Sequence, residues 1–238
     1  MTRVGIILIA TGRYISFFDP VYKSYEKYFL PGYKKNYFLL TDSEQSFGDN
    51  VFTYKIERKG FPGDTLYRYH HFMKIKDDIM DKVDVVYYTD VDMKAVFPVG
   101  DEILPNEKQP LIAVAHPGFF LRNRMGTPET RKESLAYISP NEKRPFYVCG
   151  GVQGGFVKNY FSASENISNM IDRDGKNNII AVWHDESYWN RYMVSNLNKF
   201  KFMAANYCHP QQTKRFGLGH LQPKILALDK DHEYFRAE

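Results

Sequence analysis

The chain has 238 residues, 43% hydrophobic and 16% aromatic, which is enough apolar material for one sizeable core. Its 32 basic and 28 acidic side chains are spread along the sequence and give a formal net charge of +4. Because a nucleic-acid-binding protein concentrates its basic residues on one stripe, we expect no nucleic-acid partner. Val4 to Ala10 is far shorter than the roughly 20 apolar residues of a transmembrane segment. With only Cys149 and Cys208 as cysteines, the chain is expected to be cytoplasmic.

Apolar runs and helical periodicities alternate along the first half, which predicts an α/β fold. Val4 to Ala10 predicts a buried strand, and residues 17–30 follow with helical spacing. Further strands are expected at 37–41, 51–56 and 83–89, with one long helix at 65–82. The last of these strands leads directly into Asp90-Val91-Asp92, at the sheet edge where α/β proteins bind ligands.

The pattern becomes less regular beyond Pro98 and predicts a second, binding lobe. A short strand is expected at 111–115, and a glycine cluster follows another short apolar run near residue 149. Helices are expected at 159–173 and 185–195, and a late strand at 224–228. The charged tail from Asp229 has no core pattern.

Asp90-Val91-Asp92 is a DxD triplet at the end of a predicted strand. Alternation along an extended chain directs both carboxylates to the same side, where they can share a divalent cation with a diphosphate. The alternative is a solvated strand end at which an aspartate caps a turn. The preceding apolar strand favours the metal site.

Trp183-His184-Asp185-Glu186 precedes a helical stretch and has two interpretations. Asp185 can cap that helix while Glu186 favours its positive end, and for this motif alone we prefer that interpretation. In the functional alternative, Glu186 stabilises or attacks a developing oxocarbenium ion, and Trp183 offers a stacking face to a sugar.

Three further features have a functional and a structural interpretation. His116 ends a short strand and could hydrogen-bond a sugar, although a single histidine there is more often structural. The glycines at 150–151 and 154–155 could admit a ligand to the backbone, but their spacing is not a dinucleotide or P-loop fingerprint. Lys230 and Arg236 are expected to be solvated charges, or alternatively to close over a diphosphate.

Taken in order, these motifs resemble the family 6 glycosyltransferases, which include the histo-blood group A and B transferases and the α1,3-galactosyltransferase. The resemblance spans nearly the whole chain and rests on the spacing between blocks, which are Tyr14, Arg68, Asp90-Val91-Asp92-Met93, Glu102-Ile103-Leu104, His116-Pro117-Gly118-Phe119, Ala136-Tyr137-Ile138, Gly150-Gly151, Trp183-His184-Asp185-Glu186-Ser187 and residues 230–236. It implies a single GT-A domain with a Rossmann-like nucleotide-sugar-binding lobe and mixed central sheet (about 1–115), an acceptor-binding lobe (about 116–228) and a mobile tail (229–238).

The implied reaction moves GalNAc or galactose from a UDP-sugar to the 3-hydroxyl of a β-galactoside, with α1,3 linkage and retained configuration. The implied catalytic residue is Glu186, and Mn²⁺, or Mg²⁺, is held by Asp90 and Asp92. The implied donor-binding residues are Ile9, Thr11, Tyr14, Arg68, Asp90, Val91, Asp92, Cys149, Gly150, Gly151, Asp185, Lys230 and Arg236. The implied acceptor-binding residues are His116, Thr127, Trp183 and Glu186.

Some positions depart from the family pattern. Ile9 replaces the aromatic residue that stacks on uracil, so the contacts to the base are expected to be weaker or different. Cys149 and Gly151 match the two positions that choose the donor sugar; Gly151 leaves space for an N-acetyl group, which favours GalNAc over galactose. Some bacterial relatives replace both metal-binding aspartates by asparagine and work without metal, so Asp90 and Asp92 predict metal dependence. The lack of an anchor or stem favours a microbial or phage source.

Two other functions would share part of this pattern. A nucleotidyltransferase that makes an activated sugar would also use a nucleotide lobe and a metal-bound diphosphate, but the glycine-rich basic loop of that class is missing near the N-terminus. A non-catalytic carbohydrate-binding module would explain the 18 Tyr and 18 Phe residues, but it has no use for paired carboxylates at a sheet edge.

Overall fold

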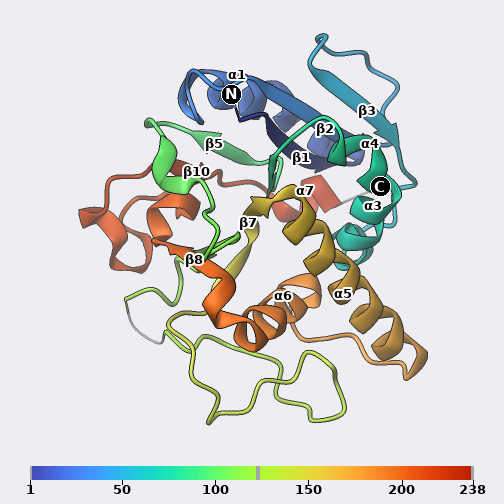
Figure 1. The fold of residues 1–238 in the computed structure, drawn as a ribbon, viewed down its shortest axis with the longest axis vertical. Coiled ribbons are helices and arrows are strands. Elements are labelled where there is room, and N and C mark those ends of the chain that lie inside the picture. Colours follow the sequence, from blue (N-terminus) through green and yellow to red (C-terminus); the bar gives the residue numbers. More distant parts are fainter. Residues whose placement is uncertain (1, 122–123, 237–238) are drawn as a thin grey trace.

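The computed structural model describes residues 2–121 and 124–236, and its centre is a mixed sheet of seven strands in the order β3-β2-β1-β4-β7-β6-β8 (Figure 1). These strands are β1 (Val4–Ala10), β2 (Lys35–Thr41), β3 (Val51–Lys55), β4 (Val85–Thr89), β6 (Leu111–Ala115), β7 (Val148–Phe156) and β8 (Phe200–Met203). The expected α/β fold with a mixed central sheet is confirmed.

The four strands from β3 to β4 are parallel and form the Rossmann-like half of the sheet. The side chains of β1 are buried on both faces, which is why Val4–Ala10 is an unbroken apolar run. The carboxyl ends of β1 and β4 lead into Thr11 and Asp90 at one edge of the sheet. The strand that leads into the acidic triplet is therefore where the sequence predicted it.

Strand β7 runs antiparallel to both β4 and β6 and carries the glycine cluster. The sequence showed these glycines only as a cluster after a short apolar run, and in the structure all four lie inside β7. A Cβ on Gly154 would stand 2.4 Å from the Tyr87 ring, and one on Gly155 2.4 Å from the Pro110 carbonyl oxygen. These two glycines are needed for close packing between strands.

Helices cover both faces of the sheet. Helix α1 (Phe18–Tyr28) packs on one face through Phe18, Val21 and Tyr25, and α5 (Val157–Lys176) and α6 (His184–Ser195) belong to the core on the other. The expected helix at 65–82 is instead three short helices, α2 (Gly63–Leu66), α3 (Arg68–Lys74) and α4 (Lys76–Met80). The chain tightens at the second break, where the Ile75 N–H bonds the Phe72 carbonyl.

A small second sheet brings the C-terminal segment to the acidic triplet. Its strands are β5 (Met93–Ala95), β10 (Ile225–Ala227) and β9 (His209–Pro210), with β10 in the middle. Beyond β10, the Leu228 N–H donates to the Asp92 carbonyl at 3.0 Å. The segment from Asp229 to Arg236, called the tail below, then forms α7 (His232–Arg236). The late strand expected at 224–228 is β10, but its pairing with β5 was not predicted.

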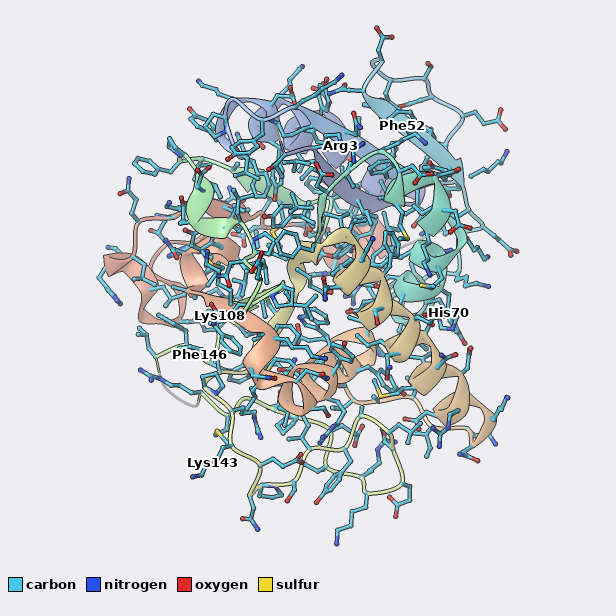
Figure 2. All side chains as sticks on the ribbon, in the orientation of Figure 1. Arg3, Phe52, His70, Lys108, Lys143 and Phe146 are labelled. Carbon is cyan, nitrogen blue, oxygen red and sulfur yellow. The ribbon has the colours of Figure 1, made fainter. Side chains whose placement is uncertain are left out.

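The charged surface is dispersed. Arg3, Lys108 and Lys143, labelled in Figure 2, lie in well-separated parts of the molecule. Among the described residues, no helix is long and apolar enough to cross a membrane.

Candidate functional site

Two cavities meet at the sheet edge that carries the acidic triplet. The smaller has a volume of about 230 Å³ and the larger about 560 Å³. Asp90, Asp92 and Lys230 line both of them. A ligand that occupies both cavities would therefore pass these three charged side chains.

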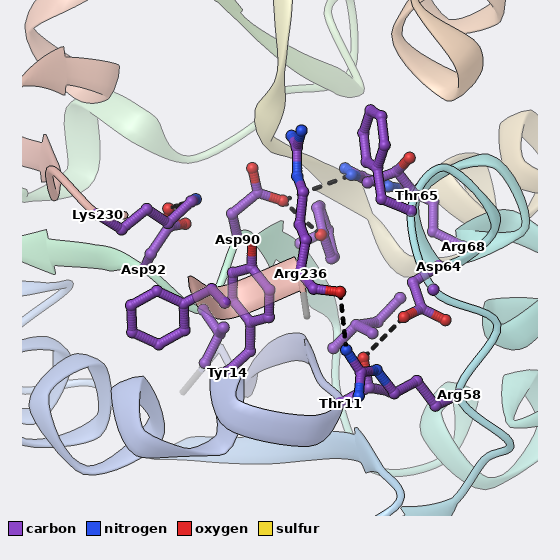
Figure 3. Close-up of a pocket in the computed structure, with 16 residues that line it drawn as sticks. Thr11, Tyr14, Arg58, Asp64, Thr65, Arg68, Asp90, Asp92, Lys230 and Arg236 are labelled. Carbon is purple, nitrogen blue, oxygen red and sulfur yellow. Dashed lines mark hydrogen bonds and ion pairs between the residues drawn. The ribbon is translucent and has the colours of Figure 1, made fainter. Parts of the chain in front are cut away.

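The smaller cavity holds most of the residues expected to bind the donor. It is lined by Ile9, Thr11, Tyr14, Arg68, Asp90, Val91, Asp92, Lys230 and Arg236 from that set. Figure 3 shows Lys230 beside Asp92 on one side of the cavity, with Thr11, Arg58 and Asp64 on the other. The Thr11 hydroxyl donates to Asp64 at 2.9 Å, which ties the end of β1 to the first turn of α2.

The tail closes one side of the smaller cavity. Phe235 packs against Tyr14 and Phe17, with ring centroids 5.3 and 4.8 Å away. The Arg236 guanidinium lies 3.7 Å from the centroid of the Phe61 ring. Arg236 therefore lines the cavity while it stays an exposed residue.

Lys230 forms an ion pair with Asp92, whose side chain is 8% exposed. Burial by itself would lower the pKa of Lys230, but the Asp92 carboxylate outweighs this effect and raises it, so the ammonium stays charged. The alternative interpretations of a solvated Lys230 and a solvated strand end at Asp92 are both wrong.

Arg68 connects the elements around the two cavities from a buried position. Its guanidinium donates to the Gly150 carbonyl at 2.9 Å and lies 3.1 Å from the Asp185 carboxylate. It is also 3.5 Å from Asp90, whose Oδ1 accepts a hydrogen bond from the Tyr88 hydroxyl at 2.5 Å. One cation thus sets the positions of two carboxylates and of strand β7.

Asp90 and Asp92 suit a cation that is shared with a ligand. Both are hard oxygen donors, and both line both cavities. Within the described part of the chain, no group of three or more His, Cys, Asp or Glu side chains is arranged to hold a metal ion. The two carboxylates therefore fit a divalent ion whose other ligands come from a diphosphate and water.

Glu186 lies at the wall of the larger cavity. Its Oε2 accepts a hydrogen bond from the Gly150 N–H at 2.8 Å. Burial raises the pKa of Glu186 to about 7, and the Gly150 N–H opposes this rise because it bonds the charged form. A carboxylate with such a pKa changes its charge near neutral pH, as catalytic carboxylates often do.

Asp185 is not the helix cap that the sequence favoured. Helix α6 begins at His184, its N-cap is Trp183, and no side chain caps it. Asp185 is 4% exposed and faces Arg68 instead. Burial raises the pKa of Asp185 to about 7, while the nearby guanidinium lowers it. Asp185 balances the charge of the buried Arg68, and for this reason it does not cap the helix as predicted.

Cys149 and Gly151 lie on β7 and line the larger cavity. A Cβ on Gly151 would stand 2.7 Å from Asp90 Oδ2 and 2.8 Å from Met93 Cε. Glycine at this position therefore keeps the acidic triplet close to β7. Cys149 shares the cavity wall with Cys208, and both thiols are free.

His116 also lines the larger cavity, at the end of β6. Its Nδ1 accepts a hydrogen bond from the Gly118 N–H at 3.1 Å, and burial lowers the pKa of His116 to about 4. The imidazole is therefore neutral at pH 7 and carries its proton on Nε2. This nitrogen can donate to a ligand hydroxyl.

Trp183 and Thr127 lie together, away from the two cavities. The indole N–H donates to the Thr127 hydroxyl at 2.7 Å, and both residues line a separate hollow. Trp183 is 47% exposed, so one indole face is available to a ligand. The structure therefore distributes the expected acceptor residues over two neighbouring surfaces.

The sequence did not single out several cavity residues, which include Arg58, Phe61, Tyr88, Cys208 and Phe235. Most lie in loops or in the tail, where no periodicity marks a side chain as inward. A Phe-Pro pair after Gly60 was the one signal for Phe61, since it indicates a defined turn beside the predicted helix.

Similarity to known proteins extends over nearly the whole chain. The sequence model of glycosyltransferase family 6 matches residues 1–237. The chain is 30% identical over 234 residues to the O-antigen biosynthesis glycosyltransferase WbnI of Escherichia coli, covering 97% of this chain and 96% of that protein. It is 29% identical to the histo-blood group ABO system transferase 1 of Rattus norvegicus, over 99% of this chain and 69% of the relative. It is 28% identical to the globoside alpha-1,3-N-acetylgalactosaminyltransferase 1 of Gallus gallus, over 86% of this chain and 61% of the relative.

Proposed function

Because the chain belongs to glycosyltransferase family 6, we propose that it transfers GalNAc, or galactose, from UDP to the 3-hydroxyl of a β-galactoside with retained configuration. The observation that carries this proposal is the pair of cavities that meet at Asp90 and Asp92. The nucleotide occupies the smaller cavity, the acceptor enters the larger one, and the diphosphate lies between them. Similarity to the globoside alpha-1,3-N-acetylgalactosaminyltransferase 1 of Gallus gallus supports α1,3 transfer of N-acetylgalactosamine.

The charges around the shared edge suit a diphosphate leaving group. Asp90 and Asp92 would hold Mn²⁺ or Mg²⁺, which neutralises the leaving UDP when bound. Lys230 lines both cavities, and it can exchange its contact with Asp92 for one with a phosphate oxygen. Arg236 lines the smaller cavity and adds a second positive charge there. The tail then excludes water from the donor.

The residues at the larger cavity suit the acceptor side of the reaction. His116 donates from Nε2 and orients the acceptor, and the Glu186 carboxylate stabilises positive charge at the anomeric carbon. The Gly150 N–H and the helix turn of α6 fix the Glu186 carboxylate in place. Trp183, held by Thr127, binds a more distant part of the acceptor through its exposed indole face.

We propose GalNAc as the preferred sugar because Gly151 adds no side chain to the larger cavity. A Gly151→Ala variant would push against Asp90 and Met93, so its transfer rates with both donors should fall. If the small residue also admits the N-acetyl group, UDP-GalNAc should lose more of its kcat/KM than UDP-galactose. Equal losses with the two donors would reject this basis for donor choice.

The proposal is tested by UDP release from UDP-GalNAc and UDP-galactose in the presence of Mn²⁺, with and without a β-galactoside acceptor. We expect release that the acceptor stimulates and that EDTA abolishes. Calorimetry with the acceptor alone separates a transferase from a glycan-binding module, because the module would bind without UDP. Absence of release from both donors, in protein shown to be folded, would reject UDP-sugars as substrates.

A further inference from the structure

Strand β7 changes its pairing at the point where it passes the site. It pairs with β6 at Gln153 opposite Ala113 and at Val148 opposite Ala115, so the register shifts between these pairs. On the other side, the pairing with β4 ends at Val152 opposite Thr89. The Gly151 carbonyl still accepts from the Asp90 N–H at 2.9 Å, but the peptide groups of Val148 and Gly150 need partners from outside the regular ladder.

Site residues supply the partners of Gly150. Its N–H donates to Glu186, and its carbonyl accepts from Arg68 and from the Gln153 amide, the latter at 3.0 Å. The position of the Glu186 carboxylate thus depends on the distance between helix α6 and this irregular part of β7.

Asn190 supplies the partners of Val148 and lies one helical turn beyond Glu186. Its Oδ1 accepts from the Val148 N–H at 2.9 Å, and its Nδ2 donates to the Val148 carbonyl at 2.8 Å. The same Nδ2 donates to the Glu186 carbonyl at 2.9 Å. The side chain is 0% exposed and therefore touches no ligand. The Asn190 amide makes the hydrogen bonds to Val148 that a neighbouring strand would otherwise make, and in this way it links α6 to β7.

We propose that Asn190 is a positioning residue for the transfer reaction, because it fixes the α6 turn that carries Glu186 against the Gly150 peptide. This inference rests on the proposed function of Glu186. Since Asn190 bonds both Val148 and Glu186, loss of its donor lets α6 move relative to β7. A displacement of about 1 Å at a reacting group can lower a rate about 100-fold.

The test compares three variants in the UDP-GalNAc assay. Asn190→Asp keeps the shape of the side chain but replaces the donor with an oxygen that faces two carbonyl oxygens. Tyr188→Phe is the matched control, since Tyr188 is buried on the same helix and donates to Asp174 at 2.8 Å, away from β7. Glu186→Gln tests the proposed function itself.

We expect kcat of Asn190→Asp to fall about 10- to 100-fold with KM for UDP-GalNAc changed less than about threefold. Tyr188→Phe should keep kcat within about threefold of the unmodified protein, even if its melting temperature falls as far as that of Asn190→Asp. Asn190→Ser replaces the aspartate variant if that protein does not fold.

The outcomes distinguish the positioning role of Asn190 from the proposed function of Glu186. If Asn190→Asp keeps its kcat while Glu186→Gln loses activity, the positioning role is wrong and the role of Glu186 stands. If Asn190→Asp and Tyr188→Phe lose kcat equally for equal loss of melting temperature, Asn190 is merely structural. If Glu186→Gln keeps full kcat, the proposed function of Glu186 is wrong.

Discussion

The wall that β7 and α6 form beside the larger cavity is held by buried hydrogen bonds, whereas the tail beside the smaller cavity is held by ring contacts, one ion pair and exposed hydrogen bonds from Arg13 and Arg58 to its carbonyl groups. Glu186, Gly150 and Asn190 are linked within 2.8 to 2.9 Å in the first wall. In the second, Phe235 lies on half-buried rings and Arg236 is a surface residue. We infer that the wall at the reacting carbon is preorganised, while the wall over the nucleotide can open to exchange UDP.

The largest effect is expected where the two walls meet. Asp92→Asn removes a carboxylate that lines both cavities and pairs with Lys230, so transfer should fall about 1000-fold or more. UDP-release assays measure this loss. Asp77→Asn, on the exposed face of α4, is the control and should keep full activity. Activity of Asp92→Asn within tenfold of the unmodified protein would argue against a shared metal at this edge.

The preorganised wall predicts a pH profile. The pKa of Glu186 is raised to about 7 from its ordinary value, so the carboxylate gains a proton as the pH falls through 7. If the charged form is needed, kcat/KM should fall about tenfold for each pH unit well below 7. Rates measured between pH 5.5 and 9 test this, and Glu186→Gln should lack the acid limb. A profile that is flat down to pH 5.5 would show that Glu186 ionisation is not required.

The tail wall should affect nucleotide affinity more than chemistry. Phe235→Ala removes the ring contacts with Tyr14 and Phe17 that attach the tail, each worth about 0.5–1.5 kcal/mol, so the Kd for UDP should rise about tenfold. The kcat at saturating donor should change much less. Calorimetry with UDP and Mn²⁺ gives the Kd, and Glu233→Ala on the exposed side of α7 is the control. If kcat falls while the Kd for UDP is unchanged, the tail acts on the chemical step and not on nucleotide binding, which would contradict the roles inferred for the two walls.

A smaller effect is expected at the hollow beside Trp183. Glu129 accepts hydrogen bonds from Arg131 and from the Val182 N–H, and the Arg131 contact above all lowers the pKa of Glu129 to about 2. The stability that this bonding contributes is present above pH 4.5 and is lost as the pH falls toward 2. Since Arg131 is half-exposed, Glu129→Gln should cost about 2 kcal/mol at pH 7. Urea unfolding of both proteins at pH 7 and pH 3 measures this cost. An equal loss of unfolding free energy at the two pH values would show that the charge of Glu129 is not its cause.

Local patterns were enough to predict the parallel half of the sheet and the place of the acidic triplet. Val4 to Ala10 is apolar because both faces of β1 are buried, and Asp90 follows β4 directly. The spacing between motifs also predicted residues that line the smaller cavity, among them Tyr14 and Arg236. Whether those residues bind the donor stays a prediction.

The remaining contacts depend on long-range pairing that no local pattern records. Lys230 meets Asp92 because β10 pairs with β5, which lies some 130 positions earlier in the chain. The glycine cluster was not predicted as part of a strand, because a strand that packs this closely needs residues without the side chains that mark strands. Asn190 was not identified from the sequence, although its spacing of four residues from Glu186 places both on one face of the helix.

The structure of the transferred product tests the central proposal most directly. UDP-GalNAc and a β-galactoside acceptor are incubated with the protein and Mn²⁺, and the purified product is analysed by NMR. We expect a GalNAc residue joined through an α1,3 linkage, with the configuration of the donor retained, and no product from Glu186→Gln. A β-linked product, or the same product formed at full rate by Glu186→Gln, would contradict a retaining transfer at the wall that β7 and α6 build.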